Sequence, residues 1–447
     1  MNDKFPTYYL ESLGCAKNTV DSHSIASLLG LSGYQGITDP SQASVLIVNT
    51  CGFIEAARQE SIETLQELAK NKSGEQILIA AGCLTEQYTQ RMIDSVPGIN
   101  GILGCRRWMD IINLIHTVRQ GKTHPQLPYH LLGDQQPGDK VPTVTRAAKE
   151  GSSAYLKIAD GCRRGCAFCA IPLIKGTTVS RTLDSLVRDA RTLQEQGTQE
   201  LILIAQDTTD YGVDLGIKNG LAKLLESLVK EIPDIPWIRI MYAFPGYVDD
   251  QLINVMASHQ QILPYLDIPL QHAHPDVLKR MKRPSNMDWV HKTLTKMRKM
   301  MPGLALRTTF IVGYPDETEA EFNTLLDFIE DIQFDRAGAF TYSYEANTAS
   351  AAIGDTIPAE IKAERLERLM LKQEAISLQI NQRFIGQQLE VLIEGCDGDI
   401  SIARSYRDAP EIDGLVIIEG CLPAGKILPV VISGAMAHDL TARPLSS

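Results

Sequence analysis

The sequence predicts an α/β protein with an N-terminal open parallel α/β sheet domain, a central partial (β/α)6 barrel and a small C-terminal antiparallel β-barrel. Patterns of apolar strand, turn and helix repeat through the first 120 residues and again between residues 150 and 382, as in parallel sheets with crossover helices. From residue 383 onward, short β runs and glycine-containing turns replace that pattern. A chain of 447 residues is long enough for about three domains.

The first domain, residues 1–120, is expected to contain a parallel sheet in which a helix follows each of the first three strands. The predicted strands are Tyr8–Leu13, Val45–Asn49, Ile77–Ala81 and Gly101–Leu103. The predicted helices are Asn18–Leu29, Ile54–Lys70 and Thr85–Val96.

Three cysteines, Cys15, Cys51 and Cys83, each follow the end of a predicted strand of this domain. The carboxyl ends of parallel strands meet at one edge of a sheet, and ligands bind at that edge. A single cysteine there is commonly a buried apolar thiol, but three at equivalent positions favour a shared ligand. We call them the first cysteine set. Cys105 follows the fourth strand in the sequence GCRRW and is expected to be structural.

A linker is predicted at residues 121–149, because four prolines and scattered polar residues interrupt the periodicity there. The central domain, residues 150–382, then shows six strand-like runs. They are Ala154–Ala159, Glu200–Ala205, Trp237–Ala243, Tyr265–Pro269, Ala305–Val312 and Ala337–Tyr342. Helical patterns between and after them cover Leu183–Gln196, Leu221–Glu231, Trp289–Met301, Glu319–Ile329 and Ala359–Gln382. Barrels of this type place their active sites at the carboxyl ends of the strands.

A second group of cysteines lies directly after the first barrel strand, in the stretch YLKIADGCRRGCAFCAIP from Tyr155 to Pro172. Cys162, Cys166 and Cys169 form this second cysteine set. Structural zinc needs four ligands in a closed tetrahedron, and no fourth cysteine or histidine is near in sequence, so an open site is expected. An iron–sulfur cluster on three thiolates leaves one iron free. An incidental zinc or redox site is the alternative.

The spacing Cys-x3-Cys-x-Phe-Cys at Cys162, Cys166, Phe168 and Cys169 resembles the radical S-adenosylmethionine enzymes. In that family the free iron binds the amino and carboxylate groups of the methionine moiety, and the resemblance implies that Phe168 lies near the adenine.

Polar residues at the predicted rim of the barrel are candidates for binding the same cosubstrate. Gln206 and Asp207 follow the second strand, and Gln271 and His272 follow the fourth. Asp207 could instead cap the next segment, and Gln206 could bond a loop backbone.

Two further groups of charged residues have both a structural and a functional interpretation. Family resemblance places Arg307 near the cosubstrate, although it could pair with Asp267. The segment Gly313–Phe322 resembles the family's glycine-rich strand-to-helix turn. Its three glutamates, Glu317, Glu319 and Glu321, are expected to be solvated charges at the start of a helix.

The stretch of about 60 residues from Phe384 to Leu440 resembles the TRAM domain, a β-barrel module that usually binds RNA. Its predicted strands are Gln388–Ile393, Ile400–Ser405, Gly414–Ile418 and Ile427–Ser433. From residue 383 onward the chain has five basic and nine acidic residues, a balance that would repel phosphates and attract a basic protein. Asp408, Glu411 and Asp413 lie together in one loop and are expected either to contact that partner or to be solvated turn residues.

The composition agrees with this view of the partner. The net charge of −11 argues against a general nucleic-acid binder. No export leader and no apolar run of about 18 residues are recognised, so a cytoplasmic protein without membrane contact is expected. The nine cysteines are accordingly expected to be metal ligands or buried thiols rather than disulfides.

The order of these parts resembles the methylthiotransferases, and the segment ARSYRDAPEIDG at 403–414 resembles the RimO type of that family. This resemblance implies two 4Fe-4S clusters, one on each cysteine set, with S-adenosylmethionine as radical source and methyl donor. The implied reaction places a methylthio group on the β-carbon of an aspartate in small-subunit ribosomal protein S-twelve. An electron donor such as flavodoxin or ferredoxin is implied as well. The alternatives are the sibling enzyme that modifies a tRNA adenosine and a non-catalytic iron–sulfur carrier.

Overall fold

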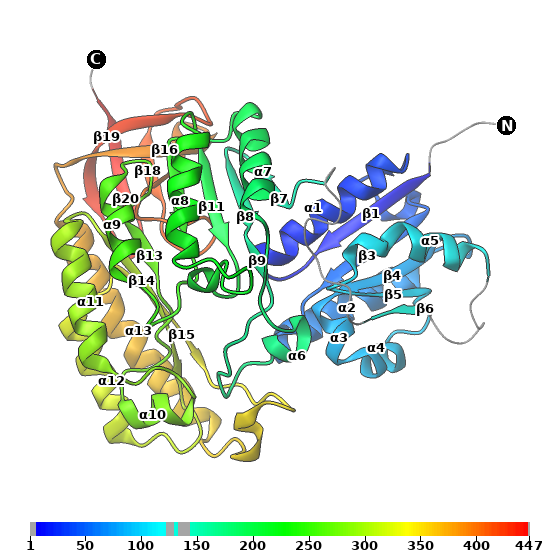
Figure 1. Cartoon of the computed structure of the whole chain (residues 1–447), viewed down its shortest axis with the longest axis horizontal. Helices are drawn as coiled ribbons and strands as arrows, with labels where there is room; N and C mark the ends of the chain where they lie inside the picture. The colour runs from blue at the N-terminus through cyan, green and yellow to red at the C-terminus, as the bar shows by residue number, and fades with distance from the viewer. Residues whose placement is uncertain (1–5, 122–128, 133–143, 446–447) are drawn as a thin grey trace.

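The computed structural model describes residues 6–121, 129–132 and 144–445 of the chain. Figure 1 shows an N-terminal part on one side, a larger central part on the other, and a small barrel at one end of the central part. The prolines of the predicted linker lie outside the described residues.

The N-terminal part is a six-stranded, fully parallel sheet in the order β2-β1-β3-β4-β5-β6. Its strands are β1 Thr7–Ser12, β2 Gln35–Gly36, β3 Val45–Thr50, β4 Ile77–Gly82, β5 Gly101–Gly104 and β6 Tyr129–Leu131. Its helices are α1 Ala16–Leu31, α2 Glu55–Asn71, α3 Cys83–Gln87, α4 Thr89–Ser95 and α5 Ile111–Arg119, with short 3-10 turns at Pro40–Gln42 and Trp108–Asp110. The four predicted strands are confirmed. The predicted helix at 85–96 is instead two helices that meet at Tyr88.

The two faces of this sheet pack against different helices, as the alternation of side chains along buried strands requires. Val45 and Ile47 of β3 pack with Leu29 of α1 on one face. Leu46 of the same strand packs with Leu65 of α2 on the other. Helices thus cover both faces of the sheet. The turns that follow the strands gather at the edge formed by the carboxyl ends, because all six strands are parallel.

The central part contains the six predicted parallel strands as two neighbouring sheets, β12-β11-β8-β7 and β13-β14-β15. A bridge between Ile238 and Ile262 links them into one partial barrel. Its strands are β7 Ala147–Glu150, β8 Ser153–Lys157, β11 Glu200–Ile204, β12 Trp237–Ile240, β13 Tyr265–Asp267, β14 Ala305–Val312 and β15 Arg336–Thr341. The additional strand β7 pairs antiparallel with β8 at the edge. A small hairpin, β9 Ala159–Asp160 with β10 Val179–Ser180, encloses the second cysteine set.

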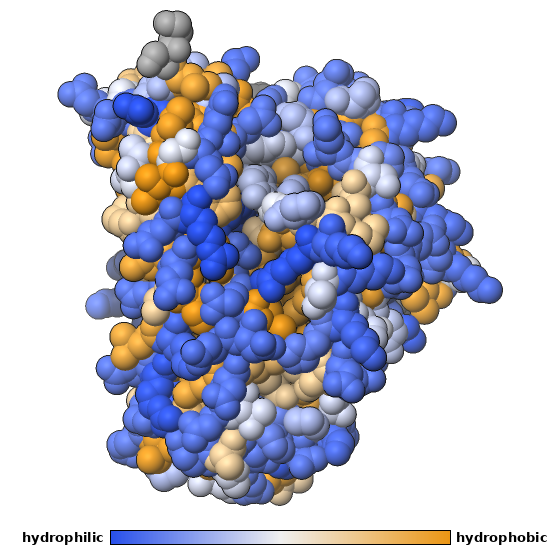
Figure 2. Space-filling view, turned by 90° about the vertical axis from the view of Figure 1, so that its left-hand side faces the viewer, coloured by the Kyte–Doolittle hydropathy of each residue, from blue (hydrophilic) through white to orange (hydrophobic). Residues whose placement is uncertain are grey.

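Helices cover the outside of the partial barrel (Figure 1). They are α7 Leu183–Glu195, α8 Gly220–Glu231, α9 Asp250–Ser258, α11 Met287–Met300, α12 Glu319–Ile332 and α13 Ala359–Gln382. The short helix α6 Ile171–Lys175 lies beside α3 of the N-terminal part, and α10 Pro275–Arg280 lies at the lower end of the barrel in Figure 1. The 3-10 turns are Thr208–Asp210 and Ala349–Ala352. Figure 2 shows that the outer side of this part is mostly hydrophilic, with small hydrophobic patches between the charged side chains. No helix in the described part of the chain is long and apolar enough to cross a membrane.

The C-terminal part is a closed five-stranded barrel in the order β16-β17-β18-β20-β19. Its strands are β16 Gln388–Asp397, β17 Ile400–Ser405, β18 Val416–Glu419, β19 Ile427–Ala435 and β20 Leu440–Pro444. β20 was not among the predicted strands. The barrel is antiparallel except at β18 and β20, which pair in parallel.

The expectation that no cysteine forms a disulfide is wrong at one site. Cys396 at the end of β16 and Cys421 after β18 form a disulfide, with Cα atoms 5.5 Å apart. Closure of the barrel brings these strand ends together although 25 residues separate them in sequence. The other seven cysteines are free.

The prediction of an exposed acidic loop at 408–413 is also wrong for two of its three residues. Asp408 is 1% exposed and accepts a hydrogen bond from Arg336 at 2.7 Å. Asp413 accepts bonds from Tyr265 at 2.7 Å and Arg307 at 3.2 Å. Glu411 is exposed. The carboxylates at 408 and 413 are buried because basic and hydroxyl groups of the central part lie opposite them, so this segment docks the terminal barrel onto the central part.

Candidate active site

The first cysteine set lies on three adjacent turns at the carboxyl edge of the N-terminal sheet. Cys15 follows β1, Cys51 follows β3 and Cys83 begins α3 after β4. A Cβ on Gly14 would lie 2.8 Å from the Cβ of Cys51, and one on Gly52 would lie 2.8 Å from the backbone of Leu84. The glycines therefore allow the turns to touch, and the three cysteines converge as the sequence predicts.

Asn18, which the sequence analysis did not single out, connects these turns. Its side-chain amide donates to the carbonyls of Leu13 at 2.9 Å and Thr50 at 3.1 Å. The thiol of Cys83 donates to Asn18 Oδ1 at 3.6 Å. A signal was present in the sequence CAKN, where a polar residue stands one helical turn after Cys15.

Hydrogen-bond donors surround the second cysteine set. The backbone amides of Arg164 and Ile171 donate to the sulfurs of Cys162 and Cys169, each at 3.4 Å. A guanidinium nitrogen of Arg283 donates to Cys166 Sγ at 3.6 Å. Such contacts stabilise thiolates.

Burial opposes ionisation of three thiols of the two sets, Cys51, Cys162 and Cys169. It raises the pKa of Cys162 to about 11, of Cys169 to about 12 and of Cys51 to about 11. A hydrogen bond with Cys105 lowers the pKa of Cys83 to about 7 and raises that of Cys105. At neutral pH, Cys51, Cys162 and Cys169 would ionise only on binding a metal, which displaces their protons.

The fit to an iron–sulfur cluster rests on the donor chemistry. Across the described ranges, no three ligand side chains already surround a point at single-ion distance. A four-iron cluster holds its thiolates farther apart than one ion does, and N–H groups directed at sulfur stabilise it and tune its potential. The second cysteine set has three such donors, so its residues fit that group.

A cavity of about 530 Å³ is lined by sequence neighbours of both cysteine sets. Phe53 and Ile54, which follow Cys51, line it from the N-terminal part, and Phe168, next to Cys169, lines it from the central part. Most of the remaining lining comes from β14, β15 and the segments after them: Thr309, Ile311, Ala339, Phe340, Thr341, Tyr342, Ser343 and Glu345, with Gln271 and Leu366.

Arg58 of α2 pairs with Glu345 at 2.7 Å at this junction, with both side chains buried. The pair fixes the N-terminal part against the barrel, so the cavity has walls from both.

Gln206 and Asp207 lie at the rim after β11, as expected from the sequence. The side-chain oxygen Oε1 of Gln206 is buried and has no hydrogen-bond partner in the described structure. Asp207 accepts a bond from Arg164 at 2.7 Å, and burial raises its pKa. An unpartnered buried acceptor is costly, so the oxygen of Gln206 suits a donor on a bound molecule.

Three family models match successive parts of the chain. They are the uncharacterized protein family UPF0004 at residues 7–104, the radical SAM superfamily at 156–329 and the TRAM domain at 385–445.

Curated relatives match over nearly the whole length. Ribosomal protein uS12 methylthiotransferase RimO of Chloroflexus aurantiacus is 43% identical, covering 98% of this chain and 100% of the relative. The proteins of the same name from a Thermoanaerobacter species and a Synechocystis species are 41% and 40% identical, and each comparison covers at least 96% of both chains. The chain belongs to the RimO family.

As a RimO-family protein, the chain is a radical SAM methylthiotransferase, and S-adenosylmethionine and a 4Fe-4S cluster are its family cofactors.

Solved structures of radical SAM enzymes share the fold of this chain. TsrM from Kitasatospora setae, a radical S-adenosylmethionine methyltransferase, is 12% identical with a TM-score of 0.58, covering 89% of this chain and 77% of that one. The cobalamin-dependent radical enzyme OxsB has a TM-score of 0.53 at 12% identity, covering 82% and 56%.

Arg307 of this RimO-family chain does not lie at the rim. It is the third residue of the eight-residue strand β14, whose carboxyl end is Val312. Its guanidinium pairs with Asp267 at 3.0 Å and Asp413 at 3.2 Å. The pairing with Asp267 that was the structural alternative is therefore observed, and the place of Arg307 near the cosubstrate stays a prediction.

Glu317 differs from its expectation as well. It was expected to be solvated, but it is 2% exposed and contacts His272 at 2.9 Å and Arg365 at 2.8 Å. His272 also accepts a bond from the backbone of His274 at 2.9 Å. Both ring nitrogens of His272 are thus bound within the protein, which gives it a structural role. Glu321 is also buried, against the expectation, and completes the capping box of α12, whereas Glu319 is exposed as expected.

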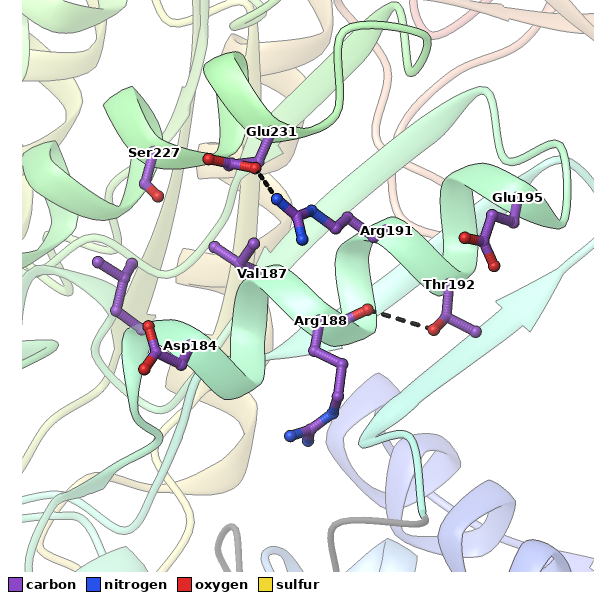
Figure 3. A pocket seen from close by; sticks show the side chains of 9 residues that line it. Asp184, Val187, Arg188, Arg191, Thr192, Glu195, Ser227 and Glu231 are labelled. Atoms are coloured by element: carbon purple, nitrogen blue, oxygen red, sulfur yellow. Dashed lines mark hydrogen bonds and ion pairs between the residues drawn. The ribbon is translucent and has the colours of Figure 1, made fainter.

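A second hollow, of about 490 Å³, lies on the outer helices α7 and α8 (Figure 3). It is lined by Arg188, Arg191 and Glu231, among others, and Arg191 pairs with Glu231. None of its lining residues is a cysteine or a rim residue. This hollow is therefore separate from the family chemistry.

Proposed function

We propose that this protein places a methylthio group on the β-carbon of an aspartate in ribosomal protein uS12. The reaction would use two 4Fe-4S clusters, with S-adenosylmethionine as both radical source and methyl donor. The observation that supports this most directly is the cavity lined by residues next to both cysteine sets. A substrate side chain in it would meet both clusters at once, as replacing a C–H bond with a C–S bond requires.

The proposed division of labour follows the three parts of the chain. Residues 1–120 hold the first cluster through Cys15, Cys51 and Cys83. Residues 150–382 hold the second through Cys162, Cys166 and Cys169, and residues 383–447 form the TRAM-like barrel. When bound there, a cluster on the second cysteine set would supply the electron for cleavage of S-adenosylmethionine, and a cluster on the first set would present the sulfur for transfer.

The protein's own residues would orient the cosubstrate and exclude water. The free oxygen of Gln206 would accept a hydrogen bond from the amine or the ribose of S-adenosylmethionine, and Phe168 would contact its adenine. Asp207 would act through Arg164, to which it is bound. The apolar wall made by Phe53, Phe340 and their neighbours would keep water from a radical intermediate.

The partners follow from the family and the charge. A basic ribosomal protein would be drawn to a chain of net charge −11. Reduction would come from a donor such as flavodoxin or ferredoxin, and both partners would be met in the cytoplasm.

The test uses the anaerobically reconstituted protein in three separate reactions. One contains purified uS12 protein, one contains a tRNA anticodon arm, and one contains no substrate. We expect 5'-deoxyadenosine in the reductant-supplied reactions and a methylthio mass increase only on uS12. Modification of the tRNA alone would assign the sibling activity. Two intact clusters without cosubstrate cleavage would assign an iron–sulfur carrier.

A further inference from the structure

Five charged side chains form a buried network where the N-terminal part meets the barrel. Asp21 of α1 and Asp160 of β9 accept from three cations. The side-chain nitrogens of Arg146, Lys157 and Lys175 lie 2.8, 2.7 and 3.2 Å, respectively, from the carboxylate of Asp21. The same three groups lie 3.0, 2.5 and 3.7 Å from the carboxylate of Asp160. Each side chain is at most 10% exposed. The network therefore lies in a low-dielectric junction, where charge imbalance is costly.

The network is not neutral. Three cations face two carboxylates, which leaves one positive charge among these five groups. Removing Lys175 would leave two cations and two carboxylates, a balanced set. The additional lysine is thus unnecessary for pairing within the network, and its charge calls for an anion nearby.

The proposed first cluster lies beside this lysine. Cys83 and Cys105 pack in one buried group with Ala170 and Ile174. The thiol of Cys105 donates to the carbonyl of Ile174, the residue before Lys175, at 3.8 Å. The positive charge of Lys175 favours the thiolate form of both Cys83 and Cys105, and so acts to lower the pKa of each thiol. A four-iron core with two positive charges on three thiolates has one net negative charge, which would balance the network.

We propose that Lys175 is the built-in countercharge of the first cluster, held in place by Asp21 and Asp160. Its charge would favour the reduced cluster, which is more negative by one electron, and so raise the cluster's reduction potential. Lys175 is a positioning residue, because it touches neither substrate nor reacting atoms. This inference rests on the assignment of the first cluster in the proposed function.

The test uses the full chain with the second cysteine set replaced by alanine, so that only the first cluster contributes to the signal. After anaerobic reconstitution, iron is counted and the midpoint potential is measured by a redox titration followed by electron paramagnetic resonance. The variants are Lys175→Met, Lys175→Arg and Asp160→Asn. Lys70→Met removes the same charge from an exposed site of the N-terminal part and serves as the control.

Lys175→Met should shift the potential to more negative values, and Asp160→Asn should shift it to more positive values. Lys175→Arg and Lys70→Met should retain the parent potential. A purely structural network predicts lower stability for both neutralising variants without shifts of opposite sign. Equal potentials, or shifts in the same direction, would overturn the proposal. If the parent protein binds no iron, the first-cluster assignment fails as well, whereas full iron content with equal potentials overturns only the role of Lys175.

Discussion

Glu200→Gln is expected to weaken the docking of the terminal barrel on the central part. Glu200 of β11 is fully buried and accepts from Arg239 at 2.6 Å and from Arg404 of the terminal barrel at 2.7 Å. Ser153 donates to it at 3.0 Å. The substitution keeps the shape but leaves two buried guanidinium groups facing a neutral amide.

The magnitude follows from the pKa of Glu200, which lies at about 2 instead of 4.5. Burial alone would raise this pKa, and the two arginines more than reverse that effect. At about 1.4 kcal/mol per pH unit, the difference corresponds to about 3 kcal/mol. Breaking a buried ion pair typically costs about 3–5 kcal/mol, which is the same magnitude.

The pH dependence follows from the sign of this shift. Because the folded-state pKa is lowered, the stabilisation is complete above pH 4.5 and is lost as the pH falls toward 2. The free-energy difference between wild type and variant should therefore be constant between about pH 5 and 7, and it should narrow only under more acidic conditions.

The assay is urea unfolding of the apoprotein, combined with hydrogen exchange of β17 to follow the terminal barrel. Glu390→Gln, at an exposed position of β16, is the matched control. A loss smaller than about 1 kcal/mol at pH 7 for Glu200→Gln, comparable to a surface pair, would refute the reasoning.

Four other outcomes are expected. Replacing the three cysteines of the second set by alanine should abolish 5'-deoxyadenosine formation, measured by product chromatography. Iron counting should then find about four bound irons per chain instead of about eight. Alanine at the first set should retain 5'-deoxyadenosine but abolish methylthiolation, and loss of cleavage with the second cluster intact would reverse the roles. Gln206→Ala should weaken S-adenosylmethionine binding, measured by calorimetry, by about 1 kcal/mol. An unchanged dissociation constant would contradict the proposed role of Gln206. Asp408→Lys, which places a cation against Arg336, should lower stability by about 3 kcal/mol or more, whereas Glu411→Lys at an exposed site should leave the thermal midpoint unchanged.

Periodicity and spacing predicted the layers and the position of the cysteines well. Strands such as Ala305–Val312 and the helix Ala359–Gln382 agree at both ends, because apolar patterns long enough to bury one face are local properties of the chain. The convergence of Cys15, Cys51 and Cys83 followed from the parallel sheet, whose geometry sets where turns gather.

The errors concern tertiary partners. Asp408 and Asp413 look like solvated turn residues in sequence, and only the arginines and the tyrosine packed against them explain their burial. The ion pair of Arg307 with Asp413 was not predicted, because Asp413 comes from the terminal barrel. The Cys396–Cys421 disulfide depends on closure of the barrel, and Asn18 has no motif beyond its spacing from Cys15.

The central claim is that the cavity presents the β-carbon of an aspartate to a radical made at the second cysteine set. The most direct measurement supplies uS12 carrying β-deuterated aspartate and analyses the 5'-deoxyadenosine by mass spectrometry. We predict deuterium in 5'-deoxyadenosine, formed together with methylthiolated uS12, and none with unlabelled uS12. Methylthiolated product formed without any deuterium transfer would contradict the account.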